Sequence, residues 1–273
     1  MRCPSWMSTL VVVAGVATAS PARAEPWYRG EAGARRLTHL AFSAAGGVLY
    51  AISETVAKPA LAPDHCRWCS VDSLDSSVHS ALLWGNPARA ATLSDLTGFV
   101  ASPVLMLGLT ALSASGAAGE GEAAGRIIDD TIPILETVVY SELVVQAVKF
   151  SVGRQRPLAH FPLHADRVPT QDDNLSWFSG HATLTFGLAV SAGVVAHRRG
   201  SALEPVIWAA GLLLAATTSY FRMAGDEHYL TDELAGAAWG TASGLLIPRL
   251  THSLPDNLSV VPQRSGLALA GRF

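Results

Sequence analysis

The sequence predicts an all-α fold, a bundle of about five or six apolar helices, from three observations. Hydrophobic residues make up 49% of the 273 residues and charged residues only 15%, a balance that favours burial in a core or a bilayer. Apolar segments of helical length alternate with polar connections rich in Gly or Pro. No alternation of polar and apolar residues, the pattern of a strand, runs through the body of the sequence.

Six segments are expected to form the helices. Gly and Ala are frequent inside them, as they are where helices pack closely. Several are shorter than the about 20 apolar residues that cross a bilayer, so a membrane-embedded bundle and a soluble periplasmic bundle are both open. The segments are residues 37–56, 96–115, 131–150, 182–196, 205–221 and 234–247.

The N-terminus has the pattern of an export signal. Arg2 is followed by an apolar run at residues 10–19, and Ala22-Arg23-Ala24 provides an A-x-A cleavage site. Cleavage after Ala24 is expected, and an uncleaved membrane anchor is the alternative. Both interpretations place the following chain outside the cytoplasm.

Removal of the signal leaves Cys66 and Cys69 as the only cysteines. An even number of cysteines in an oxidising compartment favours a structural disulfide between them. Reduced thiols and a redox or metal site are the alternatives. His65 is adjacent, but no second pair of Cys or His residues stands at a spacing that suits a metal site.

The first candidate for anion binding is the pair Lys149 and Arg156, which six residues separate and Pro157 follows. Lys149 stands at the C-terminal end of an apolar segment. Two cations released from a helix end can converge on one anion, Arg as a planar fork and Lys as a point charge. Taken alone, the pair is better explained by basic residues that balance the helix macrodipole or snorkel to an interface.

The second candidate is Ser179-Gly180-His181, which opens a predicted helix. A Ser N-cap, a Gly that permits close approach, and free N–H groups form an anion site. His181 would lie beside the bound group and could protonate a departing oxygen. An ordinary Ser cap with an incidental His is the alternative.

The third candidate combines Arg222, His228 and Asp232 before the last predicted helix. Asp232 stands four positions after His228, so it can accept a hydrogen bond from one ring nitrogen and orient the other outward. A solvated, charged loop is the alternative.

Together, these residues resemble the type 2 phosphatidic acid phosphatase family, which belongs with the acid phosphatases and vanadium haloperoxidases. Its signature is K-x6-R-P, then P-S-G-H, then S-R-x5-H-x3-D, and the resemblance covers roughly residues 131–248. Phe178 stands where the family usually has Pro, and Phe221 where it usually has Ser. The matching residues are Lys149, Arg156, Pro157, Ser179, Gly180, His181, Arg222, His228 and Asp232.

The resemblance implies a helical bundle of the acid phosphatase/haloperoxidase type and a specific mechanism. His228 would attack phosphorus, Asp232 would orient it, and His181 would protonate the leaving oxygen. No metal ion or other cofactor is implied. The groups that would hold the phosphoryl oxygens are Lys149, Arg156, Ser179, Gly180 and Arg222.

The expected function is hydrolysis of a phosphate monoester or diphosphate, with a lipid phosphate as partner: phosphatidate, a prenyl diphosphate or a lipid A phosphate. The alternatives are a soluble periplasmic acid phosphatase, a vanadate-dependent haloperoxidase and a non-catalytic lipid-phosphate binder. A formal net charge of −3 gives no reason to expect nucleic acid as a partner. The expected location is the bacterial inner membrane with the site facing the periplasm, or otherwise the periplasm.

The motifs also predict a topology, because their loops must share one side. With the mature N-terminus outside, segment 37–56 must not cross the membrane, and its His39 and Glu54 suit a non-spanning helix. The two cysteines then lie outside, and Arg198 and Arg199 lie inside as the positive-inside rule requires. The expected domains are a signal peptide at 1–24, an extracytoplasmic segment at 25–95, the phosphatase helical core at 96–250 and a tail at 251–273.

Overall fold

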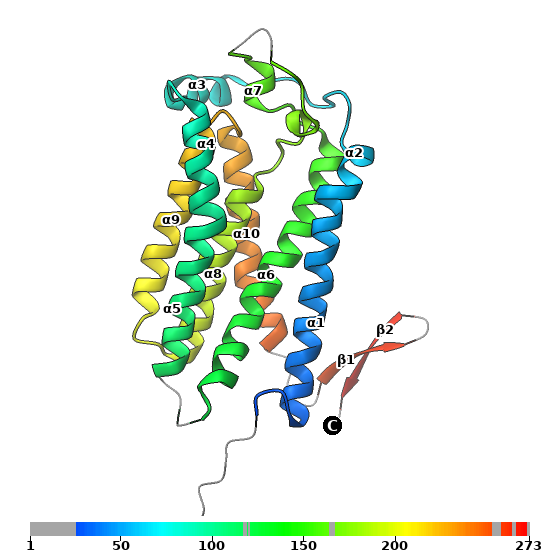
Figure 1. The fold of residues 1–273 in the computed structure, drawn as a ribbon, viewed down its shortest axis with the longest axis vertical. Helices are drawn as coiled ribbons and strands as arrows, with labels where there is room; N and C mark the ends of the chain where they lie inside the picture. Colours follow the sequence, from blue (N-terminus) through cyan, green and yellow to red (C-terminus); the bar gives the residue numbers. More distant parts are fainter. Residues whose placement is uncertain are drawn as a thin grey trace, which may run out of the picture.

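The structure is a computed structural model that describes residues 26–116, 119, 121–163, 167–252, 258–263 and 266–271. The expected signal peptide and its cleavage site lie outside these residues. The described body is a bundle of long helices whose ends gather at two opposite poles (Figure 1).

All six predicted helices are present, and each is at least as long as the apolar segment that predicted it. The bundle class is therefore confirmed. Gly153, with a φ of 62°, ends the third of these helices in the left-handed conformation, where its N–H donates to the Lys149 carbonyl oxygen. The helices are α1 (Gly30–Ile52), continued by η1 (Ser53–Ala57) and α2 (Lys58–Leu61); η2 (Leu96–Ala101) with α5 (Ser102–Gly116); α6 (Ala123–Val152); α8 (Gly180–Arg199); α9 (Glu204–Ala224); and α10 (Leu230–His252).

The short polar helices were not predicted. Helices α3 (Ser73–Leu82) and α4 (Pro87–Asp95) lack a long apolar run, and each begins at a side-chain cap: Asp72 accepts from the Asp75 N–H, and Asn86 from the Arg89 N–H. Helix α7 (Pro157–His160) and the 3₁₀ turn η3 (Gln171–Asn174) were not predicted either, and neither begins at a side-chain cap. The domain boundary expected between residues 95 and 96 falls inside one continuous helical stretch, Pro87–Gly116.

The C-terminal residues correct the all-α prediction at one point. Strands β1 (Leu258–Gln263) and β2 (Gly266–Gly271) pair antiparallel in a two-stranded hairpin. Both strands lie in the segment 251–273, which was expected to be a tail.

Among the described residues, four helical stretches are long and apolar enough to cross a membrane. The chain therefore has the helices of a membrane protein. Large apolar side chains such as Phe42, Val48 and Leu213 are exposed on their outer surfaces, as lipid contact would require. The four stretches are Gly30–Leu61, Pro87–Gly116, Ala123–Val152 and Glu204–Ala224.

The first stretch contradicts the expectation that segment 37–56 does not cross. Helix α1 runs along α6 from one pole of the bundle to the other (Figure 1). The His39 and Glu54 side chains of segment 37–56 do not prevent this, because they face α6. His39 Nδ1 lies 2.7 Å from Glu136 Oε1, and Glu54 Oε1 accepts a hydrogen bond from Gln146 Nε2. The start of α1 and the motif loops consequently lie at opposite poles.

Helix α8 is the centre of the bundle, since α5, α6, α9 and α10 all pack against it. Its contact with α10 depends on a row of glycines at four-residue spacing. A Cβ at Gly236 would lie 2.5 Å from the Ser179 carbonyl oxygen, and one at Gly240 would lie 2.5 Å from that of Thr183. These backbones approach too closely for any side chain, as in other small-residue helix contacts.

This close approach predicts different effects on the melting temperature for two Gly→Ala substitutions. Gly240→Ala should lower the melting temperature of the detergent-solubilised protein, because overpacking costs about 1–3 kcal/mol. Gly108→Ala is the matched control: it lies in α5, where an added Cβ meets nothing within 4 Å, so it should leave the melting temperature unchanged or raise it. Equal melting temperatures for the two variants would contradict the close packing of α8 on α10.

Candidate active site

The structure gathers the three motifs at one pole of the bundle (Figure 1). Every residue from them lies at a helix end or in the adjoining loop, so the apolar helix bodies act as a scaffold for polar ends. Lys149 stands in the last turn of α6, Arg156 is the N-cap of α7, Ser179 is the N-cap of α8, Arg222 is in the last turn of α9, and Asp232 is in the first turn of α10.

His228 lies between α9 and α10 with its two ring nitrogens in different surroundings. Nδ1 is 3.5 Å from both Asp232 Oδ2 and the Ser176 hydroxyl oxygen, and that hydroxyl donates to the same carboxylate oxygen at 2.6 Å. Nε2 is buried and has no hydrogen-bond partner among the described residues. The ring is thus held on the Nδ1 side and free on the Nε2 side.

The charge state of His228 follows from its position. Burial lowers the pKa of His228 well below its usual value, and the positive charges of Arg156 and Arg222 lower it further. The ring is therefore neutral at neutral pH. A neutral imidazole with a free, buried Nε2 has the lone pair that a nucleophile needs.

Arg156 and Arg222 converge, as expected of an anion site, and the group between them is Glu227. Its Oε2 accepts a hydrogen bond from Arg156 NH1 and another, at 3.1 Å, from Arg222 NH2. Both arginine Nε atoms are buried without a hydrogen-bond partner in the described part of the chain. The sequence analysis did not single out Glu227.

The groups of the second motif lie against this cluster. The Ser179 hydroxyl caps α8 by accepting from the Ala182 N–H at 3.2 Å. A Cβ added at Gly180 would lie 3.1 Å from Glu142 Oε2 and 3.7 Å from Lys149 Nζ, so both side chains approach the start of α8. Lys149 and the N-terminus of α8 can therefore contact the same anion.

His181 has a carboxylate partner that the sequence did not indicate. Its Nε2 lies 2.9 Å from Asp95 Oδ1, and the same oxygen is 3.5 Å from Arg222 NH1. Asp95 directly precedes the π-helical turn η2, whose Phe99 ring packs 4.4 Å from the His181 ring. No motif spacing links Asp95 to His181, so only the fold reveals the pair.

Arg154 lies behind Asp232 rather than in the anion site. It is 1% exposed, and its two terminal nitrogens donate to two buried carboxylates, Asp232 Oδ1 at 2.5 Å and Asp75 Oδ2 at 2.6 Å. Asp75 also accepts from the Thr231 N–H at 3.0 Å. Asp75 thereby joins α3 to the first turn of α10, next to His228.

The cysteine segment packs against the same arginine. Cys66 and Cys69 form a disulfide, with Cα atoms 5.4 Å apart. Trp68, between them, places its ring 4.1 Å from the Arg154 guanidinium, and its carbonyl oxygen accepts from the Gln155 N–H at 3.1 Å. The segment 25–95, whose role the sequence left open, thus supplies Trp68, Asp75 and Asp95 to the surroundings of the site.

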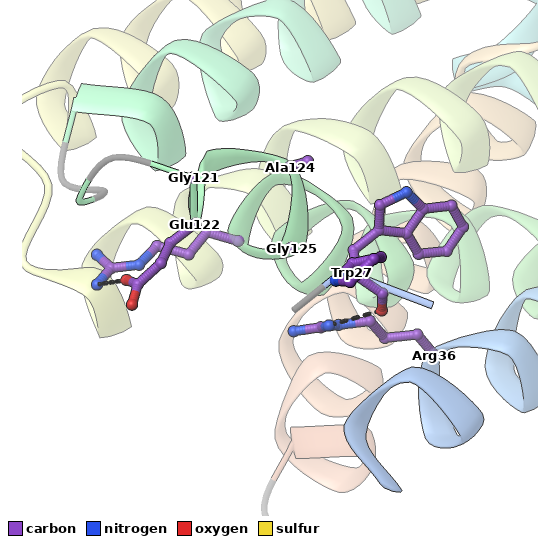
Figure 2. Close-up of a pocket in the computed structure, with 8 residues that line it drawn as sticks. Trp27, Arg36, Gly121, Glu122, Ala124 and Gly125 are labelled. Atoms are coloured by element: carbon purple, nitrogen blue, oxygen red, sulfur yellow. Dashed lines mark hydrogen bonds and ion pairs between the residues drawn. The ribbon is translucent and has the colours of Figure 1, made fainter. Parts of the chain in front are cut away.

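A separate pocket lies at the opposite pole, where α1 and α6 begin (Figure 2). Arg36 crosses it and donates to the Trp27 carbonyl oxygen at 2.8 Å. None of the residues expected at the site lines this pocket. Within the described ranges, no group of three or more His, Cys, Asp or Glu residues could hold a metal ion.

Comparison with known proteins supports the family that the sequence resembles. Residues 130–255 match the PAP2 superfamily. The match begins in α6 and extends past α10, so it contains all three motifs. The family predicted from the sequence is confirmed.

A solved structure is also similar, the crystal structure of the first transmembrane PAP2 type phosphatidylglycerolphosphate phosphatase from Bacillus subtilis. The TM-score is 0.48 and the sequence identity 13%, and the match covers 81% of this chain and 98% of that chain. No curated protein matches the chain.

The buried position of Arg154 predicts that Asp75 is far more important for stability than its neighbour on α3. Asp75→Ala leaves a buried guanidinium with one carboxylate instead of two and should cost about 3–5 kcal/mol. Asp72→Ala, which removes only a helix cap, should cost about 1 kcal/mol. Thermal unfolding in detergent measures both, and an equal loss in the two variants would show that the Asp75–Arg154 pair contributes little.

Proposed function

We propose that this PAP2 superfamily protein hydrolyses a lipid phosphate monoester or diphosphate through a phosphohistidine on His228. Family membership and the apolar helices support a membrane phosphatase in general terms. One observation carries the finer proposal: the buried, neutral His228 presents an unpartnered Nε2 beside Arg156 and Arg222. A nucleophile next to two phosphate-binding cations is the arrangement that attack on phosphorus requires.

The reaction proceeds in two steps. In the first, His228 Nε2 forms a bond to phosphorus in line with the leaving oxygen, the P–O bond breaks, and His181 gives its proton to that oxygen. Burial and Arg222 lower the pKa of His181 to about 4 in the empty site, so this step requires the negative charge of the bound phosphate to raise it. In the second, His181 takes a proton from water, whose oxygen attacks phosphorus and displaces the imidazole. The products are the dephosphorylated alcohol, or the monophosphate from a diphosphate, and inorganic phosphate.

The cations of the site would stabilise the negative charge on the phosphoryl group as it is transferred. Arg156, Arg222 and Lys149, with the Gly180 N–H, would stabilise the equatorial oxygens of the transferred phosphoryl group. Asp232 and Ser176 keep the Nδ1 side of His228 fixed, so that Nε2 stays directed at phosphorus. Asp95 fixes the His181 ring from the other side of the site.

We further propose that the site faces the periplasm. The Cys66–Cys69 disulfide lies with the motif loops, and disulfides persist in oxidising compartments. Arg198 and Arg199 end α8 at the opposite pole, which the positive-inside rule assigns to the cytoplasm.

This orientation places the start of α1 at the cytoplasmic end. Both interpretations of the N-terminus, cleavage after Ala24 and an uncleaved anchor, place the following chain outside and are incompatible with it. We retain the orientation, because it agrees with the disulfide and with the basic end of α8, and we set both interpretations aside.

A substrate at this pole would meet the site near the membrane surface, where lipid head groups lie. A phosphate carried by a lipid can reach His228 while its acyl or prenyl chains stay in the bilayer. Since the helix bodies are apolar outside and the polar groups gather at one pole, a membrane lipid phosphate fits better than a freely soluble ester.

Substitution of the two histidines tests the mechanism. His228→Ala should abolish phosphate release from a panel of phosphatidate, prenyl diphosphate and lipid A phosphate, and His181→Ala should reduce it by about 10²–10⁴-fold, the usual contribution of an acid–base group. His197→Ala, an exposed histidine at the far end of α8, is the control and should retain wild-type activity. Wild-type turnover in His228→Ala would exclude the mechanism.

The same assay with EDTA separates metal-dependent from metal-independent hydrolysis. Activity that persists in EDTA supports the histidine route. Peroxidase activity that appears only with vanadate, without phosphate release, would favour the haloperoxidase alternative instead.

A further inference from the structure

Glu227 is an acidic residue in a site that should bind anions. Its carboxylate accepts hydrogen bonds from Arg156 and Arg222, the two guanidinium groups that the proposed function assigns to phosphoryl oxygens. It also directly precedes the nucleophile in the chain. A carboxylate oxygen and a phosphoryl oxygen accept the same charge-assisted hydrogen bonds from arginine, so the two groups compete for the same donors.

The backbone around Glu227 is fixed, and its side chain has room to leave. The Glu227 N–H donates to the Arg222 carbonyl oxygen at 3.1 Å, and the preceding Asp226 is anchored by His79, whose Nε2 lies 2.7 Å from Asp226 Oδ1. The Glu227 side chain, by contrast, is 21% exposed. A rotation of the side chain toward solvent would therefore free both arginines without moving His228.

Both groups cannot occupy the arginine pair while charged. Burial opposes ionisation of Glu227, but Arg156 and Arg222 outweigh it and hold the pKa of this carboxyl below its usual value. Glu227 is thus an anion at neutral pH. A phosphoryl group at the same nitrogens would meet like charge at contact distance, which is strongly unfavourable in a partly buried site.

We propose that Glu227 is a resident competitor for the phosphate site: its carboxylate holds the arginine pair when the site is empty and is displaced when a phosphoryl group binds. The proposal rests on the proposed function, because it uses the same arginines. The free energy needed to displace the Glu227 carboxylate weakens the binding of every phosphate by the same factor. Small phosphates, including the inorganic phosphate product, lose most of their affinity, while a lipid phosphate retains the contribution of its chains.

Glu227 therefore sets how tightly a ligand must bind to occupy the site. It speeds release of inorganic phosphate, and at equal concentrations small soluble phosphates leave the site largely empty while lipid phosphates still occupy it.

The test uses the full-length protein in detergent, with orthovanadate and inorganic phosphate as probes. Glu227→Gln keeps the size of the side chain and removes its charge. The inhibition constants of both probes, measured against hydrolysis of a lipid phosphate, should fall about tenfold, equivalent to about 1.4 kcal/mol. The values of kcat/KM for p-nitrophenyl phosphate and for the lipid should rise by the same factor, because Glu227 opposes both phosphates equally.

Three further variants distinguish the effect of a carboxylate that occupies the site from the effect of negative charge elsewhere. Glu227→Ala removes the competitor altogether and should tighten probe binding at least as much as Glu227→Gln. Asp95→Asn removes a carboxylate that lies 3.5 Å from Arg222 and forms no ion pair with Arg156 in the described structure, so it should tighten binding less. Glu122→Gln, at the opposite pole, should leave both inhibition constants unchanged.

The outcomes separate this proposal from the proposed function. Unchanged or weaker probe binding in both Glu227 variants, with an active wild type, overturns the role of Glu227 alone. A wild type that releases no phosphate and binds neither probe overturns the proposed function and the competitor together. Tighter binding in the Glu227 variants, and less effect in Asp95→Asn, supports the competitor.

Discussion

The buried guanidinium of Arg154 is the constraint on which the site depends, because a charge inside a protein is costly unless it is paired with an opposite charge. It lies between Asp75 of α3 and Asp232 of α10, with the Trp68 ring against its plane. The segment from Trp68 to Asp75, the loop with Arg154 and the start of α10 are far apart in the sequence, and these contacts fix them relative to one another. Asp232 in turn faces His228. The Arg154 guanidinium, which lies outside the anion site, therefore helps to position the proposed nucleophile.

The helix bundle provides the second level of order. The glycine row of α10 brings its backbone against α8, and this contact places Ser179 and His181 at the start of one helix beside His228 and Asp232 at the start of the other. Apolar side chains cover the outer surfaces of the long helices, and the charged groups of the site gather where these helices end. The separation of apolar bodies from polar ends is the arrangement that suits chemistry at a membrane surface.

Charge balance explains why carboxylates belong in a site for anions. A group of cations without counter-ions would be costly to hold together when the site is empty. Glu227 neutralises Arg156 and Arg222, and Asp95 lies between Arg222 and His181. The carboxylates thus stabilise the folded protein, and at the same time they oppose the ligand. In our proposal, the competition between Glu227 and the phosphate has a function, since only a ligand with further contacts binds tightly enough to displace the carboxylate.

The sequence by itself determined the helices and the motif residues. Apolar length predicts each long helix, and local spacing predicts the His228–Asp232 relation, because four positions along a helix start are a short-range property. Only the tertiary structure decided the partners. Asp75, Asp95, Ser176 and Glu227 are single polar residues without a diagnostic spacing, and α1 was misjudged because the Glu136 partner of its His39 lies far along the chain. Partners of this kind are set by packing in three dimensions, which no periodicity in the sequence records.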